Sequence, residues 1–194
     1  MKRLKFALAA VALGALTAPV AAQITSAKIE FVKAVEERNG TKVVQLLREN
    51  PPGLVDARDG NGNTPLIITI GRQDDWAGFL LGEGADPNLA GKNGDTPLIV
   101  AARIGYLDAI QWLLDEKAKV DLANRMGETP LIVAVQQRQI AAIKRLLDAG
   151  ADPDRTDSAA GLSARDYAER DTRSRQILQL IEAKKPTASA SATR

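Results

Sequence analysis

Apolar residues recur along this chain at the spacing of short helices that come in pairs. Two apolar stripes lie between positions 96 and 115, formed by Leu98, Ala101 and Ala102 and then by Leu107, Ile110, Leu113 and Leu114. Spacings of three and four residues bring side chains to one face of a helix. Thr96 and Pro97 precede the first stripe as helix-start residues, and Gly105 separates the stripes as a residue that accepts a left-handed turn. The pattern therefore predicts two short helices joined by a tight turn.

The same pattern returns along the chain. The phrases GNTPLIIT, GDTPLIVA and GETPLIVA begin at Gly62, Gly94 and Gly127, so that the starts differ by 32 and then 33 residues. Between one helix pair and the next Thr-Pro lies a polar, turn-rich segment, which we expect to form an extended finger. A single helix pair cannot bury its own apolar face, so consecutive pairs should stack into a solenoid. The small side chains of Ala101, Ala102 and Ala134 would allow the close approach of neighbouring helices.

Three sequence elements recur at matching positions of successive units and together resemble the ankyrin repeat. They are Gly-x-Thr-Pro-Leu at the start, the pairs Leu80-Leu81, Leu113-Leu114 and Leu146-Leu147 in the middle, and GADPN or GADPD beginning at Gly84 and Gly150. The resemblance implies an all-α solenoid of about five helix-pair units with β-hairpin fingers. The expected ankyrin-repeat domain spans 26–185, with units near 26–58, 59–90, 91–123, 124–156 and 157–185.

Several positions depart from the family pattern. Family members often carry histidine after Thr-Pro-Leu, where this chain has Ile67, Ile99 and Ile132 and contains no histidine at all. We expect aliphatic packing there instead of a polar network. The second unit is one residue short and has no glycine that matches Gly105, so its turn between the helices should be distorted.

Two other turns also lack their glycine. Arg138 stands where the third unit has Gly105, and Lys117 stands where other units have Gly84 and Gly150. A left-handed conformation costs a non-glycine residue about 1 kcal/mol. On this basis alone, the substitution Arg138→Gly should raise the melting temperature.

The two ends of the chain are expected to lie outside the folded domain. Residues 1–22 have the layout of a secretory signal peptide, with a basic start, an apolar run from Phe6 to Leu16 and small residues before a cleavage site after Ala22. A membrane anchor would need about 20 apolar residues. The stretch 186–194 reads PTASASATR, has no large apolar residue and is expected to be a disordered tail. Such a tail could also accept O-glycans.

Removal of the leader changes the charge of the chain. The whole sequence has 26 Lys+Arg and 24 Asp+Glu, and the leader holds three of the basic residues, which leaves 23 basic and 24 acidic side chains. A formal charge of −1 argues against a nucleic-acid partner. The chain has no cysteine, which excludes disulfides and a lipid-modified cysteine. We therefore expect a soluble protein after processing, in the periplasm of a bacterium, with secretion as the alternative.

The residue inventory does not favour an enzyme. Without His and Cys, the common nucleophilic triads and zinc sites cannot form, and no cofactor or metal is expected. The stretch Asp59–Asn63 is faintly similar to a calcium loop, but its twelfth position is Ile70 instead of glutamate. The adjacent carboxylates Asp74 and Asp75 could in principle serve acid–base chemistry, and we expect them to form a solvated helix start instead.

The resemblance implies that a protein partner binds along the finger tips and the concave face of the inner helices. Glu36 and Glu37 make one end of this stripe acidic. The matching positions are Arg58, Asn61, Arg72, Lys92, Asn93, Asp95, Arg103, Ile104, Arg125, Met126, Glu128, Gln136 and Gln137. Exposed Met126 and Ile104 would add apolar contact.

These observations predict a monomeric, non-enzymatic protein that binds another protein of unknown identity through this stripe. The alternative is a secreted effector or inhibitor that acts on a host or competitor protein.

Overall fold

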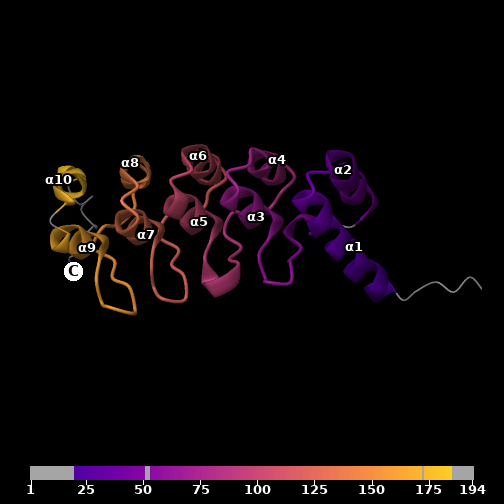
Figure 1. Cartoon of the computed structure of the whole chain (residues 1–194), viewed down its shortest axis with the longest axis horizontal. Coiled ribbons are helices and arrows are strands. Elements are labelled where there is room, and N and C mark those ends of the chain that lie inside the picture. Colours follow the sequence, from indigo (N-terminus) through magenta and orange to yellow (C-terminus); the bar gives the residue numbers. More distant parts are fainter. Residues whose placement is uncertain (1–19, 51–52, 172, 185–194) are drawn as a thin grey trace, which may run out of the picture.

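The computed structural model is an elongated stack of helix pairs, and it describes residues 20–50, 53–171 and 173–184 (Figure 1). Most of the predicted leader and the whole predicted tail lie outside these residues. The helices are α1 (Val20–Glu36), α2 (Gly40–Glu49), α3 (Pro65–Gly71), α4 (Trp76–Gly82), α5 (Pro97–Ile104), α6 (Leu107–Asp115), α7 (Pro130–Gln136), α8 (Ile140–Asp148), α9 (Ala164–Arg170) and α10 (Arg175–Ala183), with single turns of 3-10 helix at Leu54–Asp56 and Lys92–Gly94. The all-α solenoid predicted from the sequence is confirmed.

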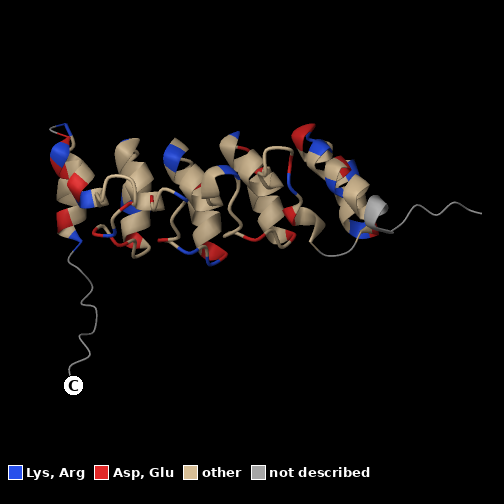
Figure 2. Ribbon diagram, turned by 90° about the horizontal axis from the view of Figure 1, so that it is seen from below, with Lys and Arg blue, Asp and Glu red and all other residues tan. Residues whose placement is uncertain are grey.

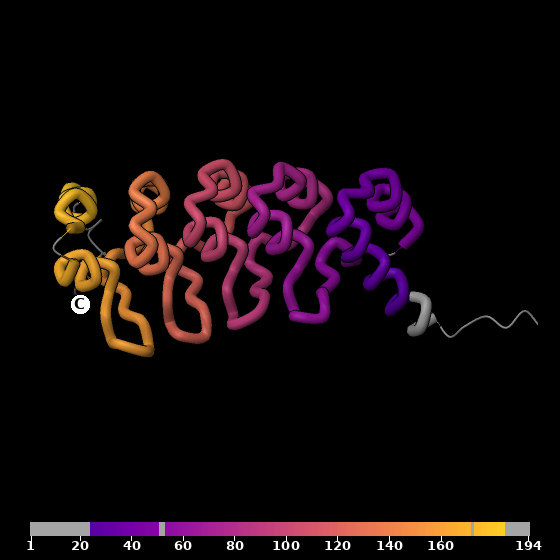
Figure 3. The backbone as a smooth tube through the Cα atoms, in the orientation of Figure 1, coloured from indigo at the N-terminus to yellow at the C-terminus, as the bar shows by residue number. Residues whose placement is uncertain are grey.

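The helices form two layers. The odd-numbered helices α1 to α9 make an inner row, the even-numbered helices α2 to α10 make an outer row, and the fingers hang below the inner row (Figures 1 and 3). Each inner helix packs on the next inner helix, and α4, α6, α8 and α10 pack in the same order. Ala101, Ala102 and Ala134 are fully buried in these contacts, as expected for small residues that permit close approach.

The Thr-Pro signal begins α3, α5 and α7 as predicted. The hydroxyl oxygens of Thr64, Thr96 and Thr129 accept hydrogen bonds from backbone N–H groups three residues later, at 3.2–3.3 Å. Ile67, Ile99 and Ile132, which stand where the resemblance implied histidine, supply those N–H groups and are themselves buried. The helix starts therefore keep their caps while the side chains contribute to the apolar core.

The left-handed turns form with or without glycine. Gly105 has φ 71°, and Gln73 and Arg138 take the same role at 54° and 57°. The expectation of a distorted turn in the second unit is wrong, because the Asp74 N–H donates to Thr69 O at 2.9 Å, as the Tyr106 N–H does to Ala101 O at 3.0 Å. The missing residue instead shortens α4, which has 7 residues against 9 in α6.

The fingers are hairpin-shaped loops, each closed by a backbone hydrogen bond. We define them as finger 1 (57–64), finger 2 (89–96), finger 3 (122–129) and finger 4 (155–163). The closing bonds run from Asp59 N to Asn63 O, Gly91 N to Asp95 O, Asn124 N to Glu128 O and Asp157 N to Leu162 O, at 2.9–3.0 Å. Within the described part of the chain, the strand-like pairing is an isolated antiparallel bridge between Thr156 and Ser163.

A side chain at one register position joins each unit to the next. Asp56 Oδ1 accepts from Asp86 N at 3.1 Å, Asn88 Oδ1 from Lys119 N at 2.8 Å and Asp121 Oδ1 from Asp152 N at 3.1 Å. In the last of these loops Asp154 stands at the same position, and its carboxylate binds Arg165 at 2.7 Å. We call this set of contacts the unit-joining bonds.

The left-handed residues give a stability prediction that adds the contacts of Arg138 to the simple expectation for this residue. Lys117 has φ 64°, and its side chain has no hydrogen-bond or ion-pair partner among the described residues. Arg138 has the same strain, but its guanidinium binds the Asp171 carboxylate at 3.2 Å and the Arg173 carbonyl at 2.9 Å. We expect Lys117→Gly to stabilise the protein by about 0.5–1 kcal/mol, or about 2–4 °C, because strain is relieved and no contact is lost.

The comparison with Arg138 tests this reasoning. Arg138→Gly should gain less than Lys117→Gly, since the lost contacts offset the relieved strain. Thermal melts followed by circular dichroism will rank the two variants. A larger gain for Arg138→Gly would show that its contacts contribute nothing.

Candidate protein-interaction surface

The tips of the fingers lie in a row below the inner helices (Figures 1 and 3), and Figure 2 shows this side of the stack from below. The predicted contact residues Arg58, Asn61, Lys92, Asn93, Arg125 and Met126 are all exposed there. Met126 is 50% exposed, so a large apolar side chain faces solvent at the tip of finger 3. Neither the Lys92 nor the Arg125 side chain has an ion-pair partner within the described residues. We call this row of six side chains the tip row.

Backbone hydrogen bonds connect fingers 2, 3 and 4 to one another. The Arg125 N–H donates to Asn93 O at 3.2 Å, and the Ser158 N–H donates to Met126 O at 2.8 Å. These bonds require close approach at Gly94 and Gly127, where a Cβ atom would meet backbone nitrogen of the next finger at 2.9 and 2.5 Å. The glycine of the repeated phrase is thus needed for contact between units as well as for its positive φ.

Finger 1 is joined to finger 2 differently. The Lys92 N–H donates to the side-chain Asn63 Oδ1 at 3.0 Å. The Arg58 guanidinium donates to Ala90 O at 2.8 Å and also to Gly62 O within its own finger. Gly91 leaves the space that the Asn63 side chain fills, because a Cβ there would lie 2.6 Å from Asn63 Oδ1. Side chains therefore replace the backbone contact at this junction.

Four of the predicted contact residues bind one another or a neighbouring finger instead of lying free. Asp95 pairs with Arg103 at 3.0 Å, and Gln136 donates to Glu128 at 3.2 Å. The Asn124 amide connects the two pairs, since it donates to Asp95 and to Glu128 at 2.9 Å. Asn124 was not singled out from the sequence, although its match to Asp59 and Asp157 in register was visible. This network holds the fingers against the inner helices.

The remaining predicted residues divide into two kinds. Gln137 is exposed, and Arg72 is exposed while its guanidinium donates to the Glu36 carbonyl at 3.0 Å. Ile104, which was expected to be exposed, is partly buried and packs against the apolar core. Its contribution to a partner surface is therefore smaller than the sequence suggested.

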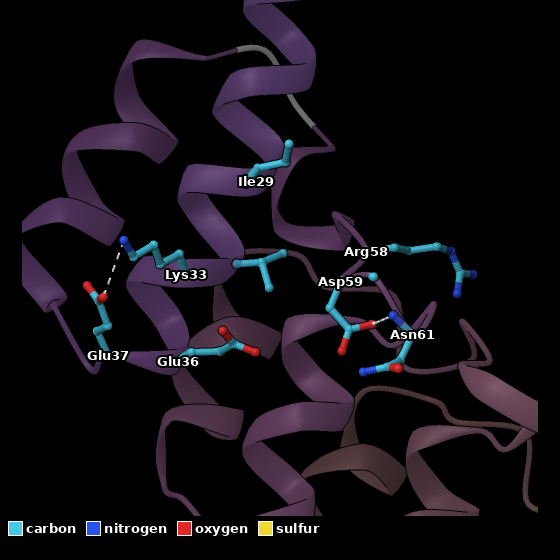
Figure 4. Close-up of a pocket in the computed structure, with 9 residues that line it drawn as sticks. Ile29, Lys33, Glu36, Glu37, Arg58, Asp59 and Asn61 are labelled. Carbon is cyan, nitrogen blue, oxygen red and sulfur yellow. Dashed lines mark hydrogen bonds and ion pairs between the residues drawn. The ribbon is translucent and has the colours of Figure 1, made fainter.

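A groove separates finger 1 from α1 at the acidic end of the stripe (Figure 4). Its volume is about 460 Å³. Ile29, Val32 and Glu36 line it from α1, and Asp59 and Asn61 line it from finger 1. The groove brings an exposed aliphatic side chain next to carboxylates from two different elements.

Asp74 does not behave as the solvated helix-start residue that the sequence suggested. Its side chain is buried, with the whole residue 3% exposed. Oδ2 accepts from Arg38 Nε at 2.8 Å and Nη2 at 2.7 Å, and Oδ1 accepts from the Trp76 N–H at 3.2 Å. The residue joins the first unit to the second, whereas its neighbour Asp75 is exposed.

Asp59 has a structural explanation that does not involve calcium. Its Oδ1 accepts from the N–H groups of Asn61 and Asn63, both at 2.8 Å, which shapes the tip of finger 1. Across the described residues, no group of three or more potential ligands is arranged to hold a metal ion. None of the described helices has the length and apolarity required to cross a membrane.

Asp157 organises finger 4 from a buried position. Its carboxylate accepts from the N–H groups of Ala160 and Gly161 at 2.7 and 3.0 Å and from Tyr167 Oη at 2.6 Å. Burial alone would raise the pKa of Asp157, but these hydrogen bonds together hold it below the ordinary value of 3.8. The bond to Asp157 raises the pKa of Tyr167 in turn.

These contacts predict how acid affects stability. Because the pKa of folded Asp157 lies below that of the unfolded chain, its contribution is fully present above the unfolded value and is lost as pH falls through the folded value. We expect Asp157→Asn to lower stability by about 1–2 kcal/mol at pH 7, since the bond to Tyr167 weakens. The difference from the parent protein should shrink as pH falls below 3.8.

Urea unfolding at pH 7, 4 and 3 tests this expectation. Burial raises the pKa of Asp56 and of Asp121, and a raised pKa affects stability in the opposite sense. Both residues are present in parent and variant, so the difference between the two proteins isolates Asp157. Parallel pH profiles would show that Asp157 does not favour its ionised form.

Comparison with known proteins supports the repeat assignment. Residues 73–157 match the family model for ankyrin repeats in three copies. The chain is 31% identical over 96 residues to alpha-latrocrustotoxin-Lt1a of Latrodectus tredecimguttatus, covering 49% of this chain and 7% of the toxin. It is 37% identical over 65 residues to ankyrin repeat domain-containing protein 63 of Homo sapiens and of Mus musculus, covering 31% of this chain and 17% of each relative. The chain thus spans a small part of these relatives, and its matched residues are similar to ankyrin repeats.

Proposed function

We propose that this chain is a non-enzymatic ankyrin-repeat protein that binds another protein through the tip row and the adjoining ends of the inner helices. The observation that carries the proposal is the connection of fingers 2, 3 and 4 by backbone hydrogen bonds, with Lys92, Arg125 and Met126 left facing solvent. A surface held in this way loses little conformational freedom on binding. Cationic and large apolar side chains are also suitable contacts for a protein partner.

Site-specific crosslinking tests which face binds. A photoreactive phenylalanine analogue placed at Met126 samples the tip row, and the same analogue at Phe79, which is 38% exposed on α4, samples the outer helices. We expect crosslinked partner bands from position 126 and none from position 79 after exposure to extract of the native cells. Bands from position 79 alone, or none from either, would contradict the proposed surface.

We further propose that the protein acts as a monomer in the periplasm. The proposal of export comes from the sequence of residues 1–22, and the formal charge of −1 that remains without them disfavours nucleic acid as a partner. Cell fractionation with an antibody to the folded domain, and light scattering of the purified protein, test these points. Recovery from the medium would favour the alternative of a secreted effector or inhibitor.

A further inference from the structure

The groove between α1 and finger 1 has an apolar side that is exposed to water. Ile29 is 66% exposed, the largest exposed fraction among the exposed large apolar side chains of the described residues. Val32 lies about one turn further along α1 and is 5% exposed. Both side chains line the groove, so an apolar group entering it would contact Ile29 and remove its surface from water.

The groove also carries negative charge that its own cations do not neutralise. Lys33 pairs with Glu37 at 3.7 Å along α1. Arg58 points away from α1, since its guanidinium binds the carbonyls of Ala90 and Gly62 (Figure 4). Glu36 and Asp59 are left without an ion-pair partner among the described residues. Two carboxylates from different elements therefore face the same space.

We propose that this groove binds a segment of the protein partner in which an aliphatic side chain lies next to a lysine or arginine. The aliphatic group would cover Ile29, and the cation would lie between the carboxylates of Glu36 and Asp59. Charge complementarity selects this occupant, because an acidic segment would be repelled by both carboxylates. The inference rests on the proposed function and specifies which chemistry the acidic end of the surface recognises.

The test removes the two unpaired carboxylates of the groove while nearly preserving its shape. The double substitution Glu36→Gln with Asp59→Asn is nearly isosteric. Asparagine is suitable at position 59, because Asn124 at the same register of finger 3 accepts from two N–H groups of its own finger at 2.9 and 3.0 Å. The matched control is Glu116→Gln with Glu169→Gln, which removes two exposed carboxylates far from the groove.

The probes are the peptides acetyl-Leu-Arg-Leu-amide and acetyl-Leu-Glu-Leu-amide, titrated into the full chain while methyl signals are followed by NMR. We expect the arginine peptide to shift the Ile29 and Val32 methyl signals and to bind the neutralised variant about tenfold more weakly than the parent or control. The glutamate peptide should cause no such shifts. Equal affinity for parent and neutralised variant, equal binding of the two peptides, or no shift at Ile29 would each overturn the proposal.

This outcome is independent of the crosslinking at Met126. A failure of the peptide titration with crosslinks present at position 126 would leave the proposed function standing and remove only the groove. Groove binding without those crosslinks would instead show that the partner surface does not extend along the tip row.

Discussion

Replacement of Gly127 by alanine is expected to destabilise the protein by about 3 kcal/mol. This is the largest effect that we expect when a single methyl group is added at a glycine of the fingers. Gly127 has φ 77°, and a Cβ atom there would lie 2.5 Å from the backbone nitrogen of Ser158 and 3.1 Å from the carbonyl carbon of Asp157. The left-handed conformation costs about 1 kcal/mol. Separation of the fingers, with loss of the Ser158 bond to Met126 O, adds about 2 kcal/mol.

Gly62 provides a matched control for this substitution. It occupies the same position in finger 1, has φ 85°, and a Cβ atom there would meet nothing within 4 Å. Gly62→Ala should therefore cost only the conformational part, about 1 kcal/mol. Urea unfolding of both variants gives the difference directly. Equal losses for the two variants would mean that contact between fingers 3 and 4 does not contribute to stability.

Replacement of Asp74 by alanine is expected to cost about 2–3 kcal/mol. The substitution removes a buried carboxylate that accepts from Arg38 at two positions and from the Trp76 N–H. Breaking a fully buried pair costs about 3–5 kcal/mol. The smaller figure applies here because the Arg38 side chain is 61% exposed and can be hydrated. The loss should be seen in unfolding experiments and should change little with salt.

A double-mutant cycle separates the Arg38–Asp74 pair from the rest of this loss. Arg38→Gln is a suitable second substitution, because Gln73 has the same left-handed turn position in the next unit, with φ 54° against 55° for Arg38. We expect a coupling energy of about 1–2 kcal/mol between the two positions. A coupling near zero would show that the carboxylate acts only through the start of α4.

The parts of the fold that could be predicted from the sequence are those that depend on residues close together in the chain. Thr96, Pro97 and Gly105 start and stop a helix by contacts within a few residues, so their roles were evident. The turn at Gln73 was not predicted correctly. Its left-handed conformation is imposed by the two packed helices on either side, which outweigh a preference of about 1 kcal/mol. A local sequence pattern contains no information about packing of this kind.

The candidate interaction surface could be predicted only in outline for a related reason. The register of the repeats indicated which residues reach the finger tips, and Met126 and Arg125 lie there. The pairing of Asp95 with Arg103 depends on how a finger folds against the inner helix of its own unit, and the burial of Asp74 against Arg38 depends on the rotation between units. That rotation is a property of the whole stack, and it decides which polar side chains are left to meet a partner.

The unit-joining bonds also indicate where an extra unit would fit into the stack. Asp56, Asn88 and Asp121 each offer an oxygen to the N–H of the following unit, whereas Arg165 occupies the carboxylate of Asp154 in the last loop of the series. Consider an extra unit copied from the third unit and inserted in the middle of the array. Its backbone N–H at the position of Lys119 and its carboxylate at the position of Asp121 would both have hydrogen-bond partners. At the far end, the carboxylate of Asp154 is bound by the Arg165 guanidinium of the fifth unit, so a charged side-chain pair replaces the bond to a backbone N–H group.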